Sequence, residues 1–422
     1  MFHRVTSSFS GKPGLFYGWY IAAIAWTMIF LTSAVPISIF FKPILDDFGW
    51  SRATLSLVQT VAMLASAAMT PVVGILIDRL GPRLMLLVTG TIQAVSNTIT
   101  GLAVNLPMIY VGRIFTEIRP IPSAQVLINR WFVKKRGRAQ GIIATGMPLA
   151  SFALIPLTQY LIFAWGWRPT LFFWSGLIFV ATLGLTWFVR NKPEEKGVGP
   201  DGVPVEKAAD IKDAKTGLVK ERVEAGVTFR ETTRTGAFWL IMLTQLICGV
   251  GCGFMMTHIV IFATDVGYSE MIGATFVSIQ GIFNLFGVLI MGYLSDRIAR
   301  KKALAVTHLI RSLAFGAVLI SIVFTDASLW IIFPAMALFG FGWFTTAPLT
   351  AGLAADLFGY RKMGTIVGAL TTGHVVGTAA GVYSGGVVFE STGSYFSFFI
   401  IQFGLELLAA AFALIIRRKT QY

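Results

Sequence analysis

The stretch that decides the fold is a short charged segment, GILIDRLGPR at 74–83, which lies between two long apolar runs. A second segment of the same form, GYLSDRIARK, occupies 292–301. Each has the pattern Gly-x-x-x-Asp-Arg followed by basic residues, and each follows the second apolar run of its half of the chain. Two copies at equivalent places indicate that the chain consists of two related halves, an arrangement typical of membrane carriers.

The apolar runs on either side of these segments predict an integral membrane protein. Of the 422 residues, 55% are hydrophobic and 13% are charged, whereas soluble domains carry about 25% charged residues. A helix needs roughly 20 apolar residues to cross a bilayer. We predict spans at 17–40, 53–77, 84–105, 107–131, 139–163, 167–190, 236–264, 271–294, 302–324, 328–354, 363–388 and 394–416.

The predicted fold class is therefore an all-α membrane protein with twelve transmembrane helices in two six-helix bundles. The first bundle is predicted over 1–190 and the second over 236–422. Between them, 191–235 is too polar to cross a membrane and predicts a cytoplasmic linker.

The formal net charge of +14 is explained by topology. Basic residues gather in alternate connectors, and the opposite connectors hold little beyond Lys42, Arg52 and Arg168. The positive-inside rule then places the linker and both termini in the cytoplasm, with the chain in the cytoplasmic (inner) membrane. Because the cations lie in short connectors, we do not expect nucleic acid as a partner. The first apolar run is long enough to span, so no cleavable signal peptide is expected.

The two charged segments resemble the signature loops of the major facilitator superfamily, between helices 2 and 3 and between helices 8 and 9. In that family the Asp and its basic neighbours form a charge network that controls the conformational switch. The resemblance implies that role, and no substrate contact, for the residues Asp78, Arg79, Arg83, Asp296 and Arg297.

Within the superfamily, the segment WFVKKRGRAQG at 131–141 is similar to the signature of monocarboxylate transporters and oxalate/formate antiporters. The Tyr17-Gly18-Trp19 opening and the FFK run at 40–42 resemble the same group. This likeness implies a small organic anion as substrate. Helix 8 departs from the group, because Asn284 and Val288 stand where an aspartate and an arginine bind the substrate carboxylate. The anion site has therefore moved, or the substrate is not a simple monocarboxylate.

Helix 4 carries charges that an apolar interior tolerates only for a reason, in GRIFTEIRPIPS at 112–123. Arg113 and Glu117 are four residues apart and can pair along one face, so Arg113 is predicted as a structural charge. Arg119 is two residues past Glu117, so in a regular helix it projects to another side. It lies near the middle of the span, where Pro120 and Pro122 are predicted to disturb the helix. We interpret Arg119 as the ligand of a substrate carboxylate; the alternative is a buried ion network with Glu117.

Other polar residues in the spans are weaker candidates. His374 in helix 11 lies where the resemblance implies a basic substrate contact, and histidine can carry a proton near neutral pH. Gln280 and Asn284 share one face of helix 8 and could bind a polar substrate or pack between helices. Glu117 and His374 are the candidate proton carriers.

No nucleotide-binding loop of the Gly-x-x-x-x-Gly-Lys-Ser/Thr form occurs, so secondary transport is expected, as proton symport or anion exchange. The alternatives are an exporter of hydrophobic compounds and a non-transporting membrane sensor. No enzyme constellation, metal cluster or cofactor site is expected, and the only two cysteines, Cys248 and Cys252, fit helix packing. The expected partners are the anion, the lipid bilayer and, for symport, protons; we expect a monomer.

Overall fold

The computed structural model describes residues 16–132, 135–202, 227–295, 297–324, 326–359 and 363–416. Within these ranges, the side chains of residues 70, 71, 78, 136, 137, 292, 363 and 364 are not described. The described residues form α-helices joined by short connections, with two brief 3-10 turns in the linker.

The described residues form twelve membrane spans, as predicted. Ten of them are long and apolar enough to span on length and composition alone. Spans 1 to 6 are α1 (Tyr17–Thr32) with α2 (Ile37–Phe48), α3 (Arg52–Leu80), α4 (Pro82–Gly101), α5 (Leu106–Thr116) with α6 (Ile121–Trp131), α7 (Arg136–Ala144) with α8 (Gly146–Trp165), and α9 (Trp167–Phe188). Spans 7 to 12 are α12 (Gly236–Asp265), α13 (Glu270–Ser295), α14 (Arg300–Phe324), α15 (Leu329–Gly342) with α16 (Thr346–Phe358), α17 (Met363–Thr392) and α18 (Phe396–Ile415).

The predicted end of span 1 at residue 40 is wrong, because the helix breaks and then continues. Pro36, which has no N–H, precedes α2, and the chain is helical again from Ile37 to Phe48. The amide of Gln93 donates to the carbonyl of Thr32, and the hydroxyl of Thr158 donates to the carbonyl of Ala34. Side chains of neighbouring helices thus satisfy the carbonyls freed by the break. As a result, Lys42 lies on a helix and not in a connector.

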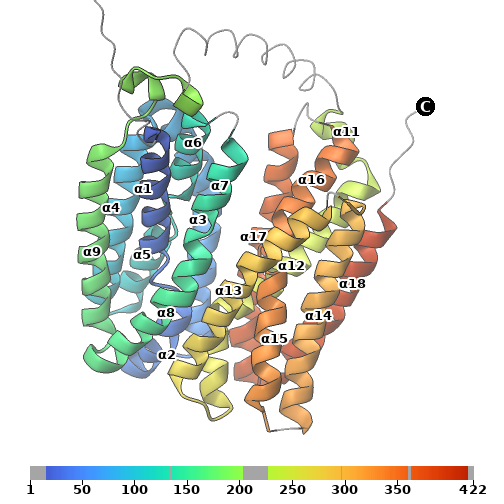
Figure 1. The fold of residues 1–422 in the computed structure, drawn as a ribbon. Coiled ribbons are helices and arrows are strands. Elements are labelled where there is room, and N and C mark those ends of the chain that lie inside the picture. The colour runs from blue at the N-terminus through green and yellow to red at the C-terminus, as the bar shows by residue number, and fades with distance from the viewer. Residues whose placement is uncertain are drawn as a thin grey trace, which may run out of the picture.

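The two halves form two helical bundles that spread apart on one side (Figure 1). The linker side, called here the linker end, carries the 3-10 turns Pro193–Lys196 and Pro200–Gly202 on the first bundle and the short helix α11 (Phe229–Thr233) on the second. At the other side, called the closed end, α8 packs on α13 and α3 packs on α17 across the two bundles.

Within the second bundle, α12 and α17 cross at very short range. A Cβ atom added at Gly377 would overlap the carbonyl oxygen of Leu246, and one at Gly381 would overlap that of Val250. In lipid the hydrophobic effect does not drive helices together. Small residues are therefore favoured at helix contacts, because they let the two backbones approach closely. Gly249 of α12 takes part as well, because a Cβ atom there would overlap the carbonyl oxygen of His374 on α17.

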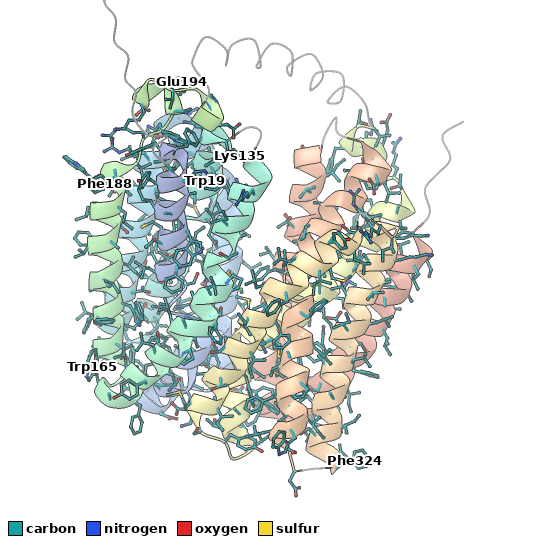
Figure 2. The ribbon with its side chains drawn as sticks, in the orientation of Figure 1. Trp19, Lys135, Trp165, Phe188, Glu194 and Phe324 are labelled. Atoms are coloured by element: carbon teal, nitrogen blue, oxygen red, sulfur yellow. The ribbon has the colours of Figure 1, made fainter. Side chains whose placement is uncertain are left out.

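The outer surface has the chemistry of a membrane face. Exposed aromatic side chains include Trp165 and Phe324 near the closed end and Phe188 near the linker end (Figure 2). Charged side chains such as Lys135 and Glu194 lie at the linker end (Figure 2). Aromatic rings at two levels with apolar surface between them match the belts at membrane–water interfaces.

Candidate functional site

Span 4 is broken at its middle, as its prolines predict. The helix α5 ends at Thr116, Glu117 caps it, and α6 starts only at Ile121 after Pro120. The hydroxyl of Ser66 on α3 donates to the free carbonyl of Glu117 at 3.0 Å. The break leaves Ile118 and Arg119 outside regular helix near the middle of span 4, while Glu117 keeps right-handed helical backbone angles.

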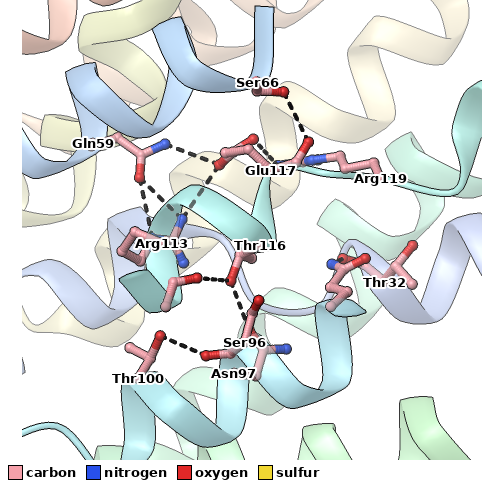
Figure 3. Close-up of polar contacts among 12 residues, drawn as sticks. Thr32, Gln59, Ser66, Ser96, Asn97, Thr100, Arg113, Thr116, Glu117 and Arg119 are labelled. Atoms are coloured by element: carbon pink, nitrogen blue, oxygen red, sulfur yellow. Dashed lines mark hydrogen bonds and ion pairs between the residues drawn. The ribbon is translucent and has the colours of Figure 1, made fainter. Parts of the chain in front are cut away.

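Glu117 is the centre of a polar network (Figure 3). Its Oε1 accepts from the Gln59 amide at 3.0 Å and from Nη2 of Arg113 at 3.5 Å. Arg113 also donates through Nε and Nη2 to Oε1 of Gln59, at 3.2 and 3.1 Å. The predicted Arg113–Glu117 pair therefore exists, and Gln59 completes it. Gln59 was missed because a lone glutamine in an apolar run gives no pairing signal.

Arg119 also binds Glu117, through Nη2 and Oε2 at 3.3 Å. In an unbroken helix, residues two apart point in different directions, so the sequence placed Arg119 elsewhere. The break removes that constraint. The two arginines thus bind opposite oxygens of one carboxylate, which gives the predicted alternative of an ion network a real geometric basis.

The side chain of Arg119 is nevertheless more exposed to solvent than those of Glu117 and Arg113. Its side chain is 25% exposed, against 10% for Glu117 and 4% for Arg113. Together with Glu117 it lines a cavity of about 280 Å³, whose other walls are Ser66, Met69 and Val73 of α3 and Ile118, Ile121 and Pro122 of span 4. That volume is at the small end of ligand pockets. A guanidinium has five N–H donors, and the pair with Glu117 uses one of those on Nη2.

The charges of this network do not cancel. Two guanidiniums face one carboxylate, so the group formed by Arg113, Glu117 and Arg119 carries a net charge of +1. Uncompensated charge at the centre of a span is costly. An anion bound at the exposed edge of Arg119 would neutralise it.

His374, Gln280 and Asn284 lie in the second bundle. Nδ1 of His374 has no hydrogen-bond partner among the described residues. The amide of Gln280 faces the sulfur atoms of Met336 and Met255 at 3.1 and 3.8 Å, and the amide of Asn284 donates to the carbonyl of Gly340 at 3.3 Å. Gln280 and Asn284 both lie on α13 and are buried, so contact with a substrate requires α13 and its neighbours to move.

The profile of the Major Facilitator Superfamily matches residues 19–382. The chain belongs to this superfamily.

Two of its relatives in sequence are named for the organic anions that they transport. It is 26% identical over 380 residues to the oxalate:formate antiporter of Oxalobacter formigenes, covering 86% of this chain and 84% of that one. It is 22% identical over 411 residues to monocarboxylate transporter 4 of Gallus gallus, covering 94% and 82%.

Solved structures agree on the fold of this superfamily member. A D-xylose-proton symporter superposes with a TM-score of 0.74 at 14% identity, covering 96% of this chain and 98% of the other. A bacterial homologue of the human lysosomal transporter Spinster, in an inward-facing and occupied conformation, gives 0.71 at 16% identity, covering 96% and 97%.

The superfamily's two signature loops make equivalent contacts in the two halves. Nε of Arg83 donates to the carbonyl of Thr186 at the end of span 6. Lys301, at the matching place of the second loop, donates to the carbonyls of Leu414 and Ile416 at the end of span 12. Each loop thus binds the last turn of its own half, and this role of Lys301 was not predicted.

Only some of the remaining predicted gating residues have described side chains. Arg79 is exposed, and the guanidinium of Arg297 stacks on the ring of Tyr293 at 4.4 Å. The side chain of Asp78 and the whole of Asp296 lie outside the described residues. The gating role of this group stays a prediction.

The second bundle holds an ion network that the sequence did not assemble. Nε of Arg311 donates to Glu406 at 2.8 Å, and Nδ1 of His308 contacts the other oxygen of that carboxylate at 2.7 Å. Arg311 also donates to the carbonyl of Cys248 at 2.9 Å. Arg311, His308 and Glu406 are 0% exposed, and Arg311 and Glu406 neutralise each other. These side chains therefore hold α12, α14 and α18 together, and the charges of Arg311 and Glu406 are used in that contact.

Proposed function

We propose that this superfamily member is a secondary carrier of a small organic anion, a mono- or dicarboxylate, which binds at Arg119 and crosses the membrane by alternating access. The observation that carries the proposal is the partly exposed guanidinium at the break of span 4, which leaves a net positive charge beside a cavity of about 280 Å³. A guanidinium binds a carboxylate through two parallel hydrogen bonds. The names of the sequence relatives support the same chemical class.

The charge pairing supports anion exchange over proton symport. Glu117 and Glu406 lie within spans, and each is already bound by an arginine. A carboxylate occupied in this way is a poor shuttle for protons, because protonation would leave its arginine without an anion. His374 is then the remaining proton candidate of the two that the sequence indicated.

The distribution of cations supports a cytoplasmic linker end, with both termini on that side. The described basic side chains at the linker end include Arg83, Lys135, Arg300 and Lys301, whereas those at the closed end are Lys42, Arg52 and Arg168. By the positive-inside rule this asymmetry sets orientation. Within this proposal the carrier acts as a monomer in the cytoplasmic membrane.

The test is transport in proteoliposomes. Vesicles loaded with unlabelled oxalate, formate or lactate, or with buffer alone, receive the same labelled anion outside, with and without a pH gradient. Exchange predicts uptake that depends on the internal anion; symport predicts uptake that follows the pH gradient from empty vesicles.

The matched variants are Arg119→Lys and Arg234→Lys. Lysine keeps the charge at 119 but loses the planar fork, so we expect uptake to fall at least tenfold at an unchanged melting temperature. Arg234 is exposed next to α11 at the linker end, and its variant should transport like the parent. Parent-like uptake by Arg119→Lys would remove that residue from the site. Flux of large hydrophobic compounds without any anion flux would favour the exporter alternative.

A further inference from the structure

The closed end is joined by charged and polar contacts that cross from one bundle to the other. The guanidinium of Arg52, at the start of α3, binds both oxygens of Asp265, at the end of α12, at 2.5 and 2.6 Å. The same guanidinium donates to the hydroxyl of Tyr395 at 3.1 Å and lies 3.5 Å from the centre of the Phe389 ring. All three partners belong to the second bundle, so Arg52 is held entirely across the bundle boundary.

The first turn of α3 is capped by the opposite bundle. Oε1 of Glu390, near the end of α17, accepts from the backbone N–H of Ala53 at 2.8 Å. Helix N-termini carry unpaired N–H groups and a partial positive charge, so a carboxylate is stabilised there. The hydroxyl of Ser51 accepts from the N–H of Thr54 in the same turn. One bundle therefore completes a helix end of the other.

Gly386 makes this approach possible. A Cβ atom at this position of α17 would lie 2.7 Å from Oγ of Ser56 and 3.0 Å from both Cα of Ala53 and the carbonyl oxygen of Arg52. Real Cβ atoms do not fit at the shortest of these separations, and two of the neighbouring atoms are backbone. The Ser56 hydroxyl can rotate away, but the two backbone atoms cannot, so a Cβ atom at 386 would require α17 and α3 to separate by a few tenths of an ångström.

A second contact across the bundles lies beside the first. Nζ of Lys42 on α2 donates to Oε1 of Glu270 on α13 at 3.0 Å, and the amide of Gln159 on α8 donates to Oε2 at 2.9 Å. Deeper in, the hydroxyl of Ser278 donates to the carbonyl of Ser151 across the boundary at 3.1 Å.

The outer contacts are partly exposed to solvent. They line a hollow of about 650 Å³, whose residues include Lys42, Arg52, Asp265 and Glu390. The side chains of Arg52 and Asp265 are 17% and 23% exposed. When the bundles separate, each charge can be hydrated at once, and partly hydrated pairs cost less to break than fully buried ones.

We infer that Arg52, Asp265 and Glu390, with Gly386 as the point of closest approach, form the gate of the closed end. These contacts exist only while the two bundles touch there, so they must break together whenever that end opens. The gate lies opposite the signature loops of the linker end and is distinct from them. The inference rests on alternating access but not on the identity of the substrate.

Thiol labelling in lipid nanodiscs tests the gate without any substrate. Ser278→Cys provides a reporter under the closed end, since Ser278 is 5% exposed. Met69→Cys, made separately, provides a reporter toward the linker end, where Met69 is 40% exposed. The native cysteines, Cys248 and Cys252, are buried and give a low background.

The gate variants are Asp265→Asn, which keeps size but removes the charge, and Gly386→Ala, which inserts one methyl group. The control is Gly404→Ala, where an added Cβ meets no atom within 4 Å. We expect both gate variants to raise the labelling rate of the Ser278→Cys reporter at least tenfold and to lower that of the Met69→Cys reporter. The control should leave both rates within a factor of two.

Opposite changes at the two ends identify a shift toward the state that is open at the closed end. Unchanged rates at both reporters, or a rise at both as in general loosening, would overturn the gate. Loss of anion transport in Arg119→Lys has no bearing on these rates, so the gate and the anion site can fail independently.

Discussion

Glu117→Gln gives the sharpest test of the charge arrangement. It replaces one oxygen atom of the network by an amide nitrogen, and it should lower the stability of the empty protein while it tightens anion binding. In the parent, the carboxylate neutralises one of two guanidiniums and competes with any external anion for Arg119. The amide keeps the shape of the side chain and loses the charge. Without ligand, the network then carries +2, and the buried Arg113 has no anion left.

The free-energy changes can be worked from this geometry. Removing one partner of a buried ion pair typically costs about 3 kcal/mol or more of stability. A substrate carboxylate on the free edge of Arg119 would lie roughly 7 Å from the Glu117 carboxylate, and two unit charges at that separation repel by about 2 kcal/mol at an effective dielectric constant of about 20. Loss of this repulsion should tighten anion binding roughly 30-fold.

The assay is binding of labelled oxalate, formate or lactate to purified protein, together with thermal unfolding with and without the anion. We expect the variant to melt earlier than the parent when empty, to bind the anion more tightly, and to gain more stability from it. Glu195→Gln removes an exposed carboxylate of the linker and should change neither quantity. Unchanged or weaker binding by a folded Glu117→Gln protein would refute the idea that this carboxylate and the substrate share one guanidinium.

Two further predictions concern the second bundle. Arg311→Met and Glu406→Gln should each lower the free energy of unfolding by about 3 to 5 kcal/mol, since each leaves the other buried group without its partner. In thermal unfolding, the double variant should lose less stability than the sum of the two single variants. Strict additivity would argue against the pair. Gly377→Ala should prevent the close crossing of α12 and α17 and sharply reduce the yield of folded protein in size-exclusion chromatography, whereas Gly404→Ala should not; equal yields would contradict the close backbone contact.

The site shows where reading a sequence as regular helices fails. Spacing alone predicted the Arg113–Glu117 pair, because Arg113 lies in α5 and Glu117, which caps that helix, still has right-handed helical backbone angles. It placed Arg119 away from Glu117, because two residues of regular helix rotate a side chain to another face. The prolines correctly predicted the break, but the direction of the chain after it depends on neighbouring helices such as α3.

Contacts between segments far apart in the chain could not be predicted from the sequence. Arg52 and Asp265, or Arg311 and Glu406, are separated by far more residues than any local pattern covers. Lys42 and Arg52 were noticed only as exceptions to the charge rule of the connectors. Their acidic partners became visible only once the two bundles were placed against each other.

By itself, the sequence determined that this chain crosses the membrane as two similar six-helix halves, because bilayer thickness fixes the length of an apolar run and the repeat of a motif can be read without coordinates. It also determined which charges lie in the membrane, since those stand out against apolar neighbours. Only the tertiary structure decided which of these charges pair with one another, and that among the described residues the network of Arg113, Glu117 and Arg119 keeps a net positive charge. That balance is a sum over helices far apart in the chain, and no local spacing contains it.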